Sequence, residues 1–467
     1  MMDWSRLLLC RRAGPSDPLD GDRTEFEQDL SRVVFSTPVR RLQDKTHVFP
    51  LEQHDAVRTR LTHSLEVSSV ARDLSQAAVR RLANHIPPEF AAAISTIAAA
   101  CALLHDVGNP PFGHAGERAI QDWFARKLAD DPRFAGTLVE REAEGNGSYL
   151  TYLPAAQDFI QFDGNAQMMR LVGRLQVLSD DNGLNLTFAT LSAACKYVVS
   201  ACDTIADRHD RSKPGFFETE RELIERVQQE TGTGVARNPI TYLVEAADDI
   251  VNVCIDLEDG IRKRVFSFPE MIEDLERHGA GGQASALRKA AEALVRKSGL
   301  GGLNIDVVYA QAFRTRLMAT LIPAVLNEFQ NSYQAIMCGD YGHELVRRSD
   351  AAVLYNACKE VVKKRIFSSS EVLRLEIMGR KVIHDLLDLY WEGVSPELRD
   401  EKGFGAKLYS IISDNYRHAF EQDLERSYPK LPPEARQHYL RLRLVCDQVA
   451  GMTDAHAVRQ HRVLTNA

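Results

Sequence analysis

The chain has 467 residues, of which 44% are hydrophobic and 26% charged, a composition typical of a soluble globular protein. Its formal net charge of -8 lacks the basic signature of a dedicated nucleic-acid binder, so we expect nucleic acid at most as an effector. The eight cysteines are scattered without a CxxC pair, and no apolar run approaches the ~20 residues that span a bilayer. We therefore predict a cytoplasmic protein that does not enter a membrane.

The chain divides into segments of different character. Residues 1–24 are polar and dotted with proline and glycine, which predicts a loosely held, flexible arm. From residue 25 onward the apolar spacing is helical nearly throughout and strand-like alternation is scarce, so we predict an all-α protein. Residues 25–275 would form a helical core, the charged, glycine-rich stretch 276–304 an insertion or linker, and residues 305–467 a second helical region.

The first candidate site residue is a histidine on a predicted apolar helix face. In the run LTHSLEVSSVARDL, His63, Val67, Val70 and Leu74 recur at i, i+4, i+7 and i+11. Taken alone, a histidine on such a face is more often a packed core residue than a ligand.

The stretch CALLHDVGNPPFGHAGE, residues 101–117, ends an apolar helix in His105 and Asp106. Buried charge is costly unless something pairs with it, and a metal ion is an economical partner. A new helix opens near His114 and carries Glu117 one turn on, at i+3. An imidazole held by a carboxylate in this way is suited to moving a proton.

A long helix is predicted over residues 239–261, PITYLVEAADDIVNVCIDLEDGI, with Pro239 at its start. Asp248, Asn252 and Asp256 lie along one edge of this helix at i, i+4 and i+8. A solvated face is the ordinary interpretation of such acids, but apolar residues border this strip on both sides.

Together these segments supply two imidazoles and two carboxylates from three helices, enough to surround one divalent ion. The four residues are His63, His105, Asp106 and Asp248. A mixed nitrogen and oxygen set suits Mn, Fe, Ni, Co or Zn and tolerates Mg, and such an ion lowers the pKa of bound water. The cations that could neutralise phosphate are Arg58, Arg60, Lys196 and Lys213. The sequence has no Walker-type glycine loop, which excludes a P-loop enzyme.

The runs RTRLTHSLEV, LLHDVGNPPFGHAGE, DGNAQ and EAADDI resemble those of the HD-domain deoxyguanosinetriphosphate triphosphohydrolases, and the resemblance covers nearly the whole chain. It implies an HD-domain core elaborated by C-terminal helices that complete the nucleotide pocket and make oligomer contacts. It further implies cleavage of dGTP, or of several dNTPs, between the 5′-oxygen and the α-phosphorus, which releases the deoxynucleoside and intact tripolyphosphate and so controls the dNTP pool. The resemblance also implies one divalent ion per site, with Mn or Mg expected first, and assembly as a tetramer or hexamer.

The resemblance also implies roles for individual residues. The metal ligands would be His63, His105, Asp106 and Asp248, with Asp248 chosen over Asp249 because it shares a helical edge with Asn252 and Asp256. The catalytic dyad would be His114 and Glu117. The phosphate contacts would be Arg60, Asn165, Lys196 and Lys213. The sugar and base pocket would contain His47, Val48, Asn252, Asp256, Phe367 and Glu376.

Two positions depart from the family pattern. His47 stands where related enzymes usually have glutamine, and Asn252 stands where many have a tyrosine under the deoxyribose. Both positions bear on sugar and base recognition, so the reaction class transfers from the family more directly than the preference for dGTP.

Two other functions stay open from the sequence. The chain could be an HD phosphohydrolase that acts on another nucleotide, such as a monophosphate or an alarmone, or a nucleotide-sensing scaffold with incidental turnover. The cations Arg60, Lys196 and Lys213 favour a triphosphate, because a monophosphatase has little use for so many. The complete set of ligand and dyad residues favours an enzyme over a scaffold.

Overall fold

Helices dominate the computed structural model of the chain. It describes residues 1–15, 22–49, 51, 57–144, 147–176, 181–298, 305–398, 400, 402–426 and 429–466. Within these residues the strands are confined to one antiparallel hairpin, so the predicted all-α class is confirmed. None of the described helices is both long and apolar enough to cross a bilayer.

The secondary-structure elements follow one another with short connections. Up to the hairpin the helices are α1 (Trp4–Leu7), α2 (Glu25–Val34), α3 (Thr37–Arg41), α4 (Arg60–Arg81), α5 (Ala91–Leu104), α6 (Gly113–Asp130) and α7 (Pro132–Ala135). The hairpin pairs β1 (Val139–Glu144) with β2 (Gly147–Tyr152). The middle helices are α8 (Pro154–Ile160), α9 (Gly164–Arg170), α10 (Phe188–Ala194), α11 (Arg221–Thr231), α12 (Pro239–Arg262), α13 (Phe268–Leu275) and α14 (Gly281–Ser298).

The C-terminal third is also helical. Its helices are α15 (Ile305–Asn331), α16 (Tyr333–Cys338), α17 (Leu345–Arg348), α18 (Ala352–Val362), α19 (Ser370–Val394), α20 (Phe404–Ser410), α21 (Asp414–Glu425), α22 (Pro433–Ala450) and α23 (Asp454–Thr465). A short segment, η8 (Lys363–Phe367), joins α18 to α19.

Three mutually packed helices, α4, α5 and α12, form the interior that positions the site. Helix α5 is almost entirely alanine, isoleucine and leucine, and a helix that is apolar on all sides is stable only when it is buried. The side chain of Asn238 caps the start of α12, and Pro239 occupies its first turn, where a missing N–H costs nothing. A residue projecting from any of these three helices is therefore held by a packed core.

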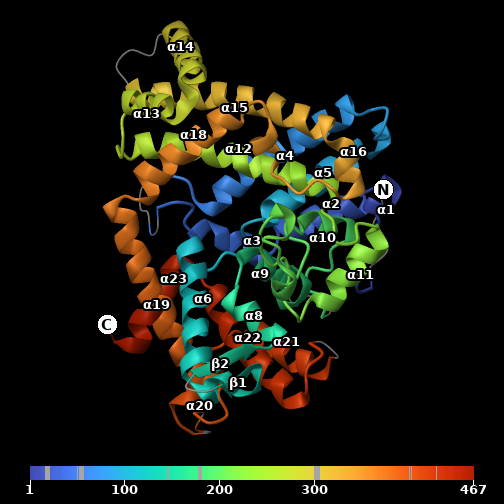
Figure 1. Cartoon of the computed structure of the whole chain (residues 1–467), viewed down its shortest axis with the longest axis vertical. Helices are drawn as coiled ribbons and strands as arrows, with labels where there is room; N and C mark the ends of the chain where they lie inside the picture. Colours follow the sequence, from blue (N-terminus) through green and yellow to red (C-terminus); the bar gives the residue numbers. More distant parts are fainter. Residues whose placement is uncertain are drawn as a thin grey trace.

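The C-terminal helices continue this core rather than forming a separate unit. Helices α15 and α18 pack on α12, whereas α19 descends beside α6 and reaches α22 (Figure 1). Segments more than 200 residues apart in the sequence, such as α6 and α19, thus pack against each other.

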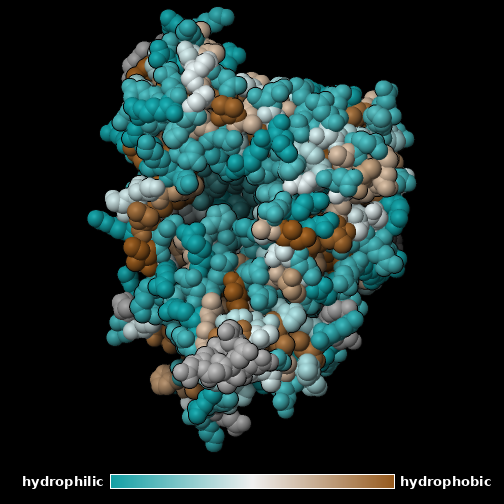
Figure 2. Space-filling view, in the orientation of Figure 1, coloured by the Kyte–Doolittle hydropathy of each residue, from teal (hydrophilic) through white to brown (hydrophobic). Residues whose placement is uncertain are grey.

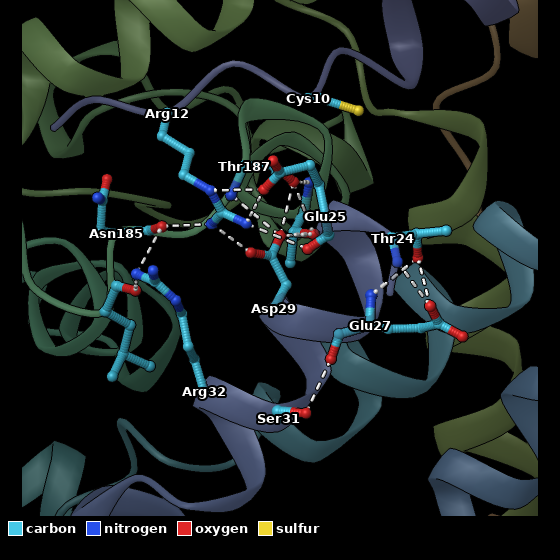
Figure 3. Close-up of polar contacts among 12 residues, drawn as sticks. Cys10, Arg12, Thr24, Glu25, Glu27, Asp29, Ser31, Arg32, Asn185 and Thr187 are labelled. Atoms are coloured by element: carbon cyan, nitrogen blue, oxygen red, sulfur yellow. Dashed lines mark hydrogen bonds and ion pairs between the residues drawn. The ribbon is translucent and has the colours of Figure 1, made fainter. Parts of the chain in front are cut away.

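The described part of the N-terminal arm is anchored, in contrast to the loose arm that we expected. Trp4 is buried, and its indole N–H donates to the Tyr333 hydroxyl at 2.8 Å. Further on, the buried guanidinium of Arg12 pairs with Glu25 and Asp29, and Asp29 also accepts hydrogen bonds from Thr187 (Figure 3). Long-range pairing of this kind leaves no periodic signal in the sequence. Residues 16–21 lie outside the description.

The predicted insertion or linker at 276–304 is largely a helix. Helix α14 packs on α15, and its buried residues Ala284, Leu287, Ala291 and Val295 recur at i, i+3, i+7 and i+11. Glycines at the start of the helix obscured this stripe in the sequence. Residues 299–304 lie outside the description, and the domain boundaries stay a prediction.

Candidate active site

A large cavity, with a volume of about 920 Å³, collects most of the predicted site residues. Its walls come from α4, α5, α6, α9, α10, α12, α17, α18, η8 and α19, and the surface is visibly hollowed in this part of the molecule (Figure 2). The predicted residues that line it are His47, Val48, Arg60, His63, His105, Asp106, His114, Asn165, Lys196, Asp248, Asn252, Asp256, Phe367 and Glu376. Glu117 and Lys213 are not among the lining residues. Glu117 contacts His114 directly, and Lys213 is linked to Asn165 through Asp163.

The innermost part of the cavity brings together the four predicted metal ligands. The Nε2 atom of His63 lies 3.1 Å from Oδ1 of Asp248, and Nε2 of His105 lies 3.5 Å from that same oxygen. Nε2 of His105 is also 3.4 Å from Oδ2 of Asp106. Helices α4 and α12 and the end of α5 thus direct two imidazoles and two carboxylates at one point.

These donor atoms fit a divalent cation. Nε2 of His105 is buried without a hydrogen-bond partner among the described residues, while Nδ1 lies 2.6 Å from the Ala102 carbonyl oxygen. The carbonyl accepts a hydrogen bond from Nδ1–H and leaves Nε2 directed at the carboxylates, the arrangement typical of a metal-bound histidine. A ring nitrogen each from His63 and His105 and an oxygen of Asp248 lie within 4.8 Å of one another.

The electrostatics of this cluster favour a cation as well. Burial lowers the pKa of His105, but the carboxylates of Asp106 and Asp248 outweigh burial and raise it to about 9. Burial, assisted by His47, lowers the pKa of His63 to about 4. Burial also raises the pKa of Asp248, yet His105 and His63 more than offset it and hold that pKa below its usual range. Two ionised carboxylates therefore share a buried pocket that attracts positive charge.

The neighbouring aspartates of α12 point in different directions. Asp248 faces the histidines, and its Oδ1 also accepts a hydrogen bond of 2.7 Å from the Asn252 amide. Asp249 instead accepts a hydrogen bond of 2.6 Å from the Tyr355 hydroxyl of α18. In the sequence, Asp248 is favoured over Asp249 because it shares a helical edge with Asn252 and Asp256. That edge corresponds to this difference in side-chain direction.

The predicted dyad is formed at the start of α6. Nδ1 of His114 lies 2.7 Å from Oε2 of Glu117, and Oε1 of Glu117 accepts the Gly164 amide at 2.8 Å. A Cβ atom at Gly164 would lie 2.9 Å from Oε1 of Glu117, so only glycine permits this approach. Burial raises the pKa of Glu117, but its bond to His114 outweighs burial and keeps the carboxylate ionised. The buried Glu117 thus orients the largely exposed imidazole of His114 at the cavity.

A sharp turn delivers His114 to this place. Phe112 and Gly113 both have positive φ angles, +64° and +57°, and the Phe112 amide donates to the Asp454 carboxylate at 2.9 Å. A Cβ at Gly113 would come within 2.6 Å of the Arg60 guanidinium. The position therefore requires glycine both for its backbone and for its space.

The predicted phosphate contacts divide into direct and indirect groups. Arg60 and Lys196 line the cavity and pair with Asp106 and Glu245 at 2.6 and 3.4 Å. Asn165 also lines it, with its backbone and side-chain N–H groups held by Asp163 at 2.8 Å.

Two of the predicted cations lie outside the cavity lining. Lys213 donates to the second oxygen of Asp163 at 2.9 Å. Arg58 pairs with Glu66, Glu258 and Asp259. Lys213 is thus linked to the lining residue Asn165 through Asp163, and phosphate binding by either cation stays a prediction.

Sequence reasoning missed several cations of the opposite wall. The additional cations that line the cavity are Arg118, Arg347, Lys359 and Lys363. Arg118 follows Glu117 directly and lies 3.5 Å from Glu376, so its place next to the motif was a usable signal. The other three come from α17, α18 and η8, far from any motif, and only the tertiary fold reveals them.

Comparison with known proteins agrees with this geometry. Residues 60–157 match the HD domain family, and residues 406–463 match the phosphohydrolase-associated domain. The chain is 34% identical to a deoxyguanosinetriphosphate triphosphohydrolase-like protein of Listeria innocua, over 98% of both chains. It is also 34% identical to the deoxyguanosinetriphosphate triphosphohydrolase of Klebsiella pneumoniae, over 94% of this chain and 93% of that one.

The Yersinia enterocolitica enzyme of the same name is 32% identical, over 95% of this chain and 94% of the relative. Likeness at this level over nearly the whole length, together with the HD domain match, confirms the resemblance found in the motifs. The chain belongs to the HD-domain deoxyguanosinetriphosphate triphosphohydrolase family and is a triphosphohydrolase.

Proposed function

We propose that the protein hydrolyses dGTP to deoxyguanosine and inorganic tripolyphosphate and thereby limits the dNTP pool. The observation that carries the proposal is one cavity that combines a cation-attracting His–Asp cluster, an oriented imidazole and several basic side chains. The names of the relatives support dGTP as the substrate.

The ion would be held by His63, His105, Asp106 and Asp248, with Mn or Mg expected first and Ni, Co, Fe or Zn compatible with the donors. When bound, a divalent ion supplies a water of lowered pKa and polarises phosphate oxygens.

His114 has the task of proton transfer. Attack of water on the α-phosphorus breaks its bond to the 5′-oxygen, and that oxygen must gain a proton as it leaves. Glu117 occupies Nδ1 of His114, so Nε2 is the nitrogen available to deliver this proton. The ionised Glu117 also stabilises the protonated imidazole.

The remaining walls would bind and orient the nucleotide. Arg60, Asn165, Lys196 and Lys213 would contact the phosphates, and Lys213 would also position Asn165 through Asp163. Glu376 would accept hydrogen bonds from N1–H and the 2-amino group of guanine, which adenine and the pyrimidines do not present in the same geometry.

His47, Val48, Asn252, Asp256 and Phe367 complete the proposed sugar and base pocket. Asp256 would hold the 3′-hydroxyl. Assembly as a tetramer or hexamer and a cytoplasmic location are further parts of the proposal.

A product assay tests the reaction directly. The purified protein is incubated with Mn²⁺ and each dNTP and NTP, and the products are separated by anion exchange. We expect tripolyphosphate and the deoxynucleoside, fastest from dGTP, and neither product from Asp106→Ala. Orthophosphate or pyrophosphate as the first product, or turnover confined to a monophosphate or alarmone, would refute the proposal. Binding without turnover would favour a scaffold.

A further inference from the structure

His47, placed above only in the sugar and base pocket, is a largely buried imidazole whose ring nitrogens need a partner. Its side chain is 9% exposed on the wall of the cavity, on the segment that leads into α4. Both Nδ1 and Nε2 are buried without a hydrogen-bond partner among the described residues. Buried polar atoms in folded proteins are almost always paired, so this imidazole, whose Nδ1 has no partner and whose Nε2 has only the Asp256 carboxylate at 3.3 Å, indicates a missing ligand.

The surroundings of His47 identify the chemistry of that ligand. Its ring stacks on the ring of His63, with centroids 4.1 Å apart and an interplanar angle of 26°. A ring nitrogen of His47, a ring nitrogen of His63 and a carboxylate oxygen of Asp106 lie within 4.8 Å of one another. Two of these three residues already belong to the proposed metal cluster, so His47 borders the same cation-attracting space.

Asp256 supplies the support that a ligating histidine usually has. Its Oδ1 atom lies 3.3 Å from Nε2 of His47. Histidines that bind metals almost always direct their second ring nitrogen at a carboxylate, a carbonyl or water, which fixes the ring and raises its basicity. Asp256 on α12 is placed for that role.

We propose that His47 is an additional ligand of the ion held by His63, His105, Asp106 and Asp248, and that it shifts the site toward transition metals. The inference rests on the metal site of the proposed function. A third imidazole makes the donor set richer in nitrogen, which suits Co, Ni or Zn, whereas Mg prefers oxygen donors and retains its waters. A glutamine at this position, as the family resemblance leads one to expect, would offer an amide in place of the imidazole.

The test measures ion binding by the metal-free, full-length protein without nucleotide. Wild type, His47→Gln and the control His343→Gln, an exposed histidine outside the cavity lining, are titrated with Co²⁺ and with Mg²⁺. We expect His47→Gln to bind Co²⁺ at least about 10-fold more weakly, since even groups that only orient a ligand are worth 10–100-fold. Its cobalt absorption bands should shift, its Mg²⁺ affinity should stay at the wild-type value, and His343→Gln should match wild type throughout.

Failure of the His47 inference and failure of the proposed metal site give different results. Wild-type cobalt affinity and spectrum in His47→Gln, combined with a raised KM for nucleotide, would show that His47 contacts the substrate and would overturn the inference alone. If wild type binds no more Co²⁺ than Asp106→Ala, the metal site of the proposed function fails with it. Should His47→Gln misfold by circular dichroism, His47→Ala takes its place. Added imidazole should then restore the wild-type cobalt bands, and bands already identical to wild type without imidazole would overturn the inference.

Discussion

Two buried clusters of charge in this protein have opposite designs. In the first, at the centre of the cavity, buried ring nitrogens of His47, His63 and His105 have no hydrogen-bond partner among the described residues. In the second, the Arg170 guanidinium lies 2.7 to 3.3 Å from carboxylate oxygens of Asp447, Glu220 and Asp423, and every one of these side chains is at most 2% exposed.

The difference separates a binding site from a structural clamp. Arg170 ends α9, and its partners Asp423 and Asp447 lie on α21 and α22, so the second cluster ties the site-bearing helices to the C-terminal ones. Its cation is part of the chain. The first cluster gathers carboxylates and imidazoles in a similar way, but its cation has to come from solution.

The largest expected effect comes from removing one oxygen ligand of the first cluster. Asp248→Asn should abolish ion binding and activity, because an amide cannot replace the charge of the carboxylate. Asp249→Asn, one residue further along α12 and bonded to Tyr355, is the matched control and should keep the ion. Calorimetric titration with Mn²⁺ and the rate of tripolyphosphate release measure both variants. Equal losses in the two would contradict the assignment.

The catalytic role of His114, at the edge of the cavity, should be separable by mutation from ion binding at the metal cluster. His114→Ala should retain ion and nucleotide binding while kcat falls by about 10²–10⁴-fold, the usual contribution of a positioned acid or base. Saturation kinetics and binding of dGTP to the variant give the two values. Loss of binding with an unchanged kcat would show that His114 holds substrate and does not transfer the proton.

The clamp should affect stability rather than chemistry. Arg170→Met removes the buried cation shared by three buried carboxylates, which should lower the free energy of unfolding by about 3–5 kcal/mol even though Arg443 stays near Asp447 and Arg174 near Asp423. Arg296→Met, whose side chain is 74% exposed, should change it by no more than about 0.5 kcal/mol. Urea denaturation measures both. If Arg170→Met is as stable as Arg296→Met, the paired cluster does not clamp the fold.

The smallest expected effect concerns the sugar. Asn252→Tyr should sharpen the preference for dGTP over GTP, because a ring under the sugar rejects a 2′-hydroxyl by packing, a term worth about 1–3 kcal/mol or 10–200-fold. The ratio of kcat/KM values for the two substrates measures it in wild type and variant. If wild type already rejects GTP by more than ~10³-fold, packing at position 252 does not set the preference.

Much of the site could be predicted from the sequence because most residues of the first cluster lie on or directly after regular helices, whose apolar spacing is visible in short segments. Helical spacing placed His63 and His105 on buried faces, and those faces belong to α4 and α5, which pack on one another. The i, i+3 spacing of His114 and Glu117 likewise becomes a hydrogen bond of 2.7 Å. Local periodicity is sufficient wherever the supporting element is a regular helix.

Ion pairs between residues far apart in the sequence could not be predicted from helical spacing. A lysine or arginine near a motif looks unpaired in the sequence, but Arg58 pairs with Glu66 of α4 and with acids of α12, and Lys213 pairs with Asp163. Arg12 pairs with Asp29 and anchors a segment that looked loose. Conversely, Arg347 and Lys359 reach the cavity only because α17 and α18 fold against α12. Which acid meets which base is decided by tertiary structure.

The most direct test of the central claim follows the oxygen atom of the attacking water. dGTP is hydrolysed in H₂¹⁸O with Mn²⁺, and the products are analysed by mass spectrometry. Water attack at the α-phosphorus predicts one ¹⁸O atom in tripolyphosphate and none in deoxyguanosine. Label in the deoxynucleoside, or label in orthophosphate or pyrophosphate formed directly from dGTP, would contradict the account.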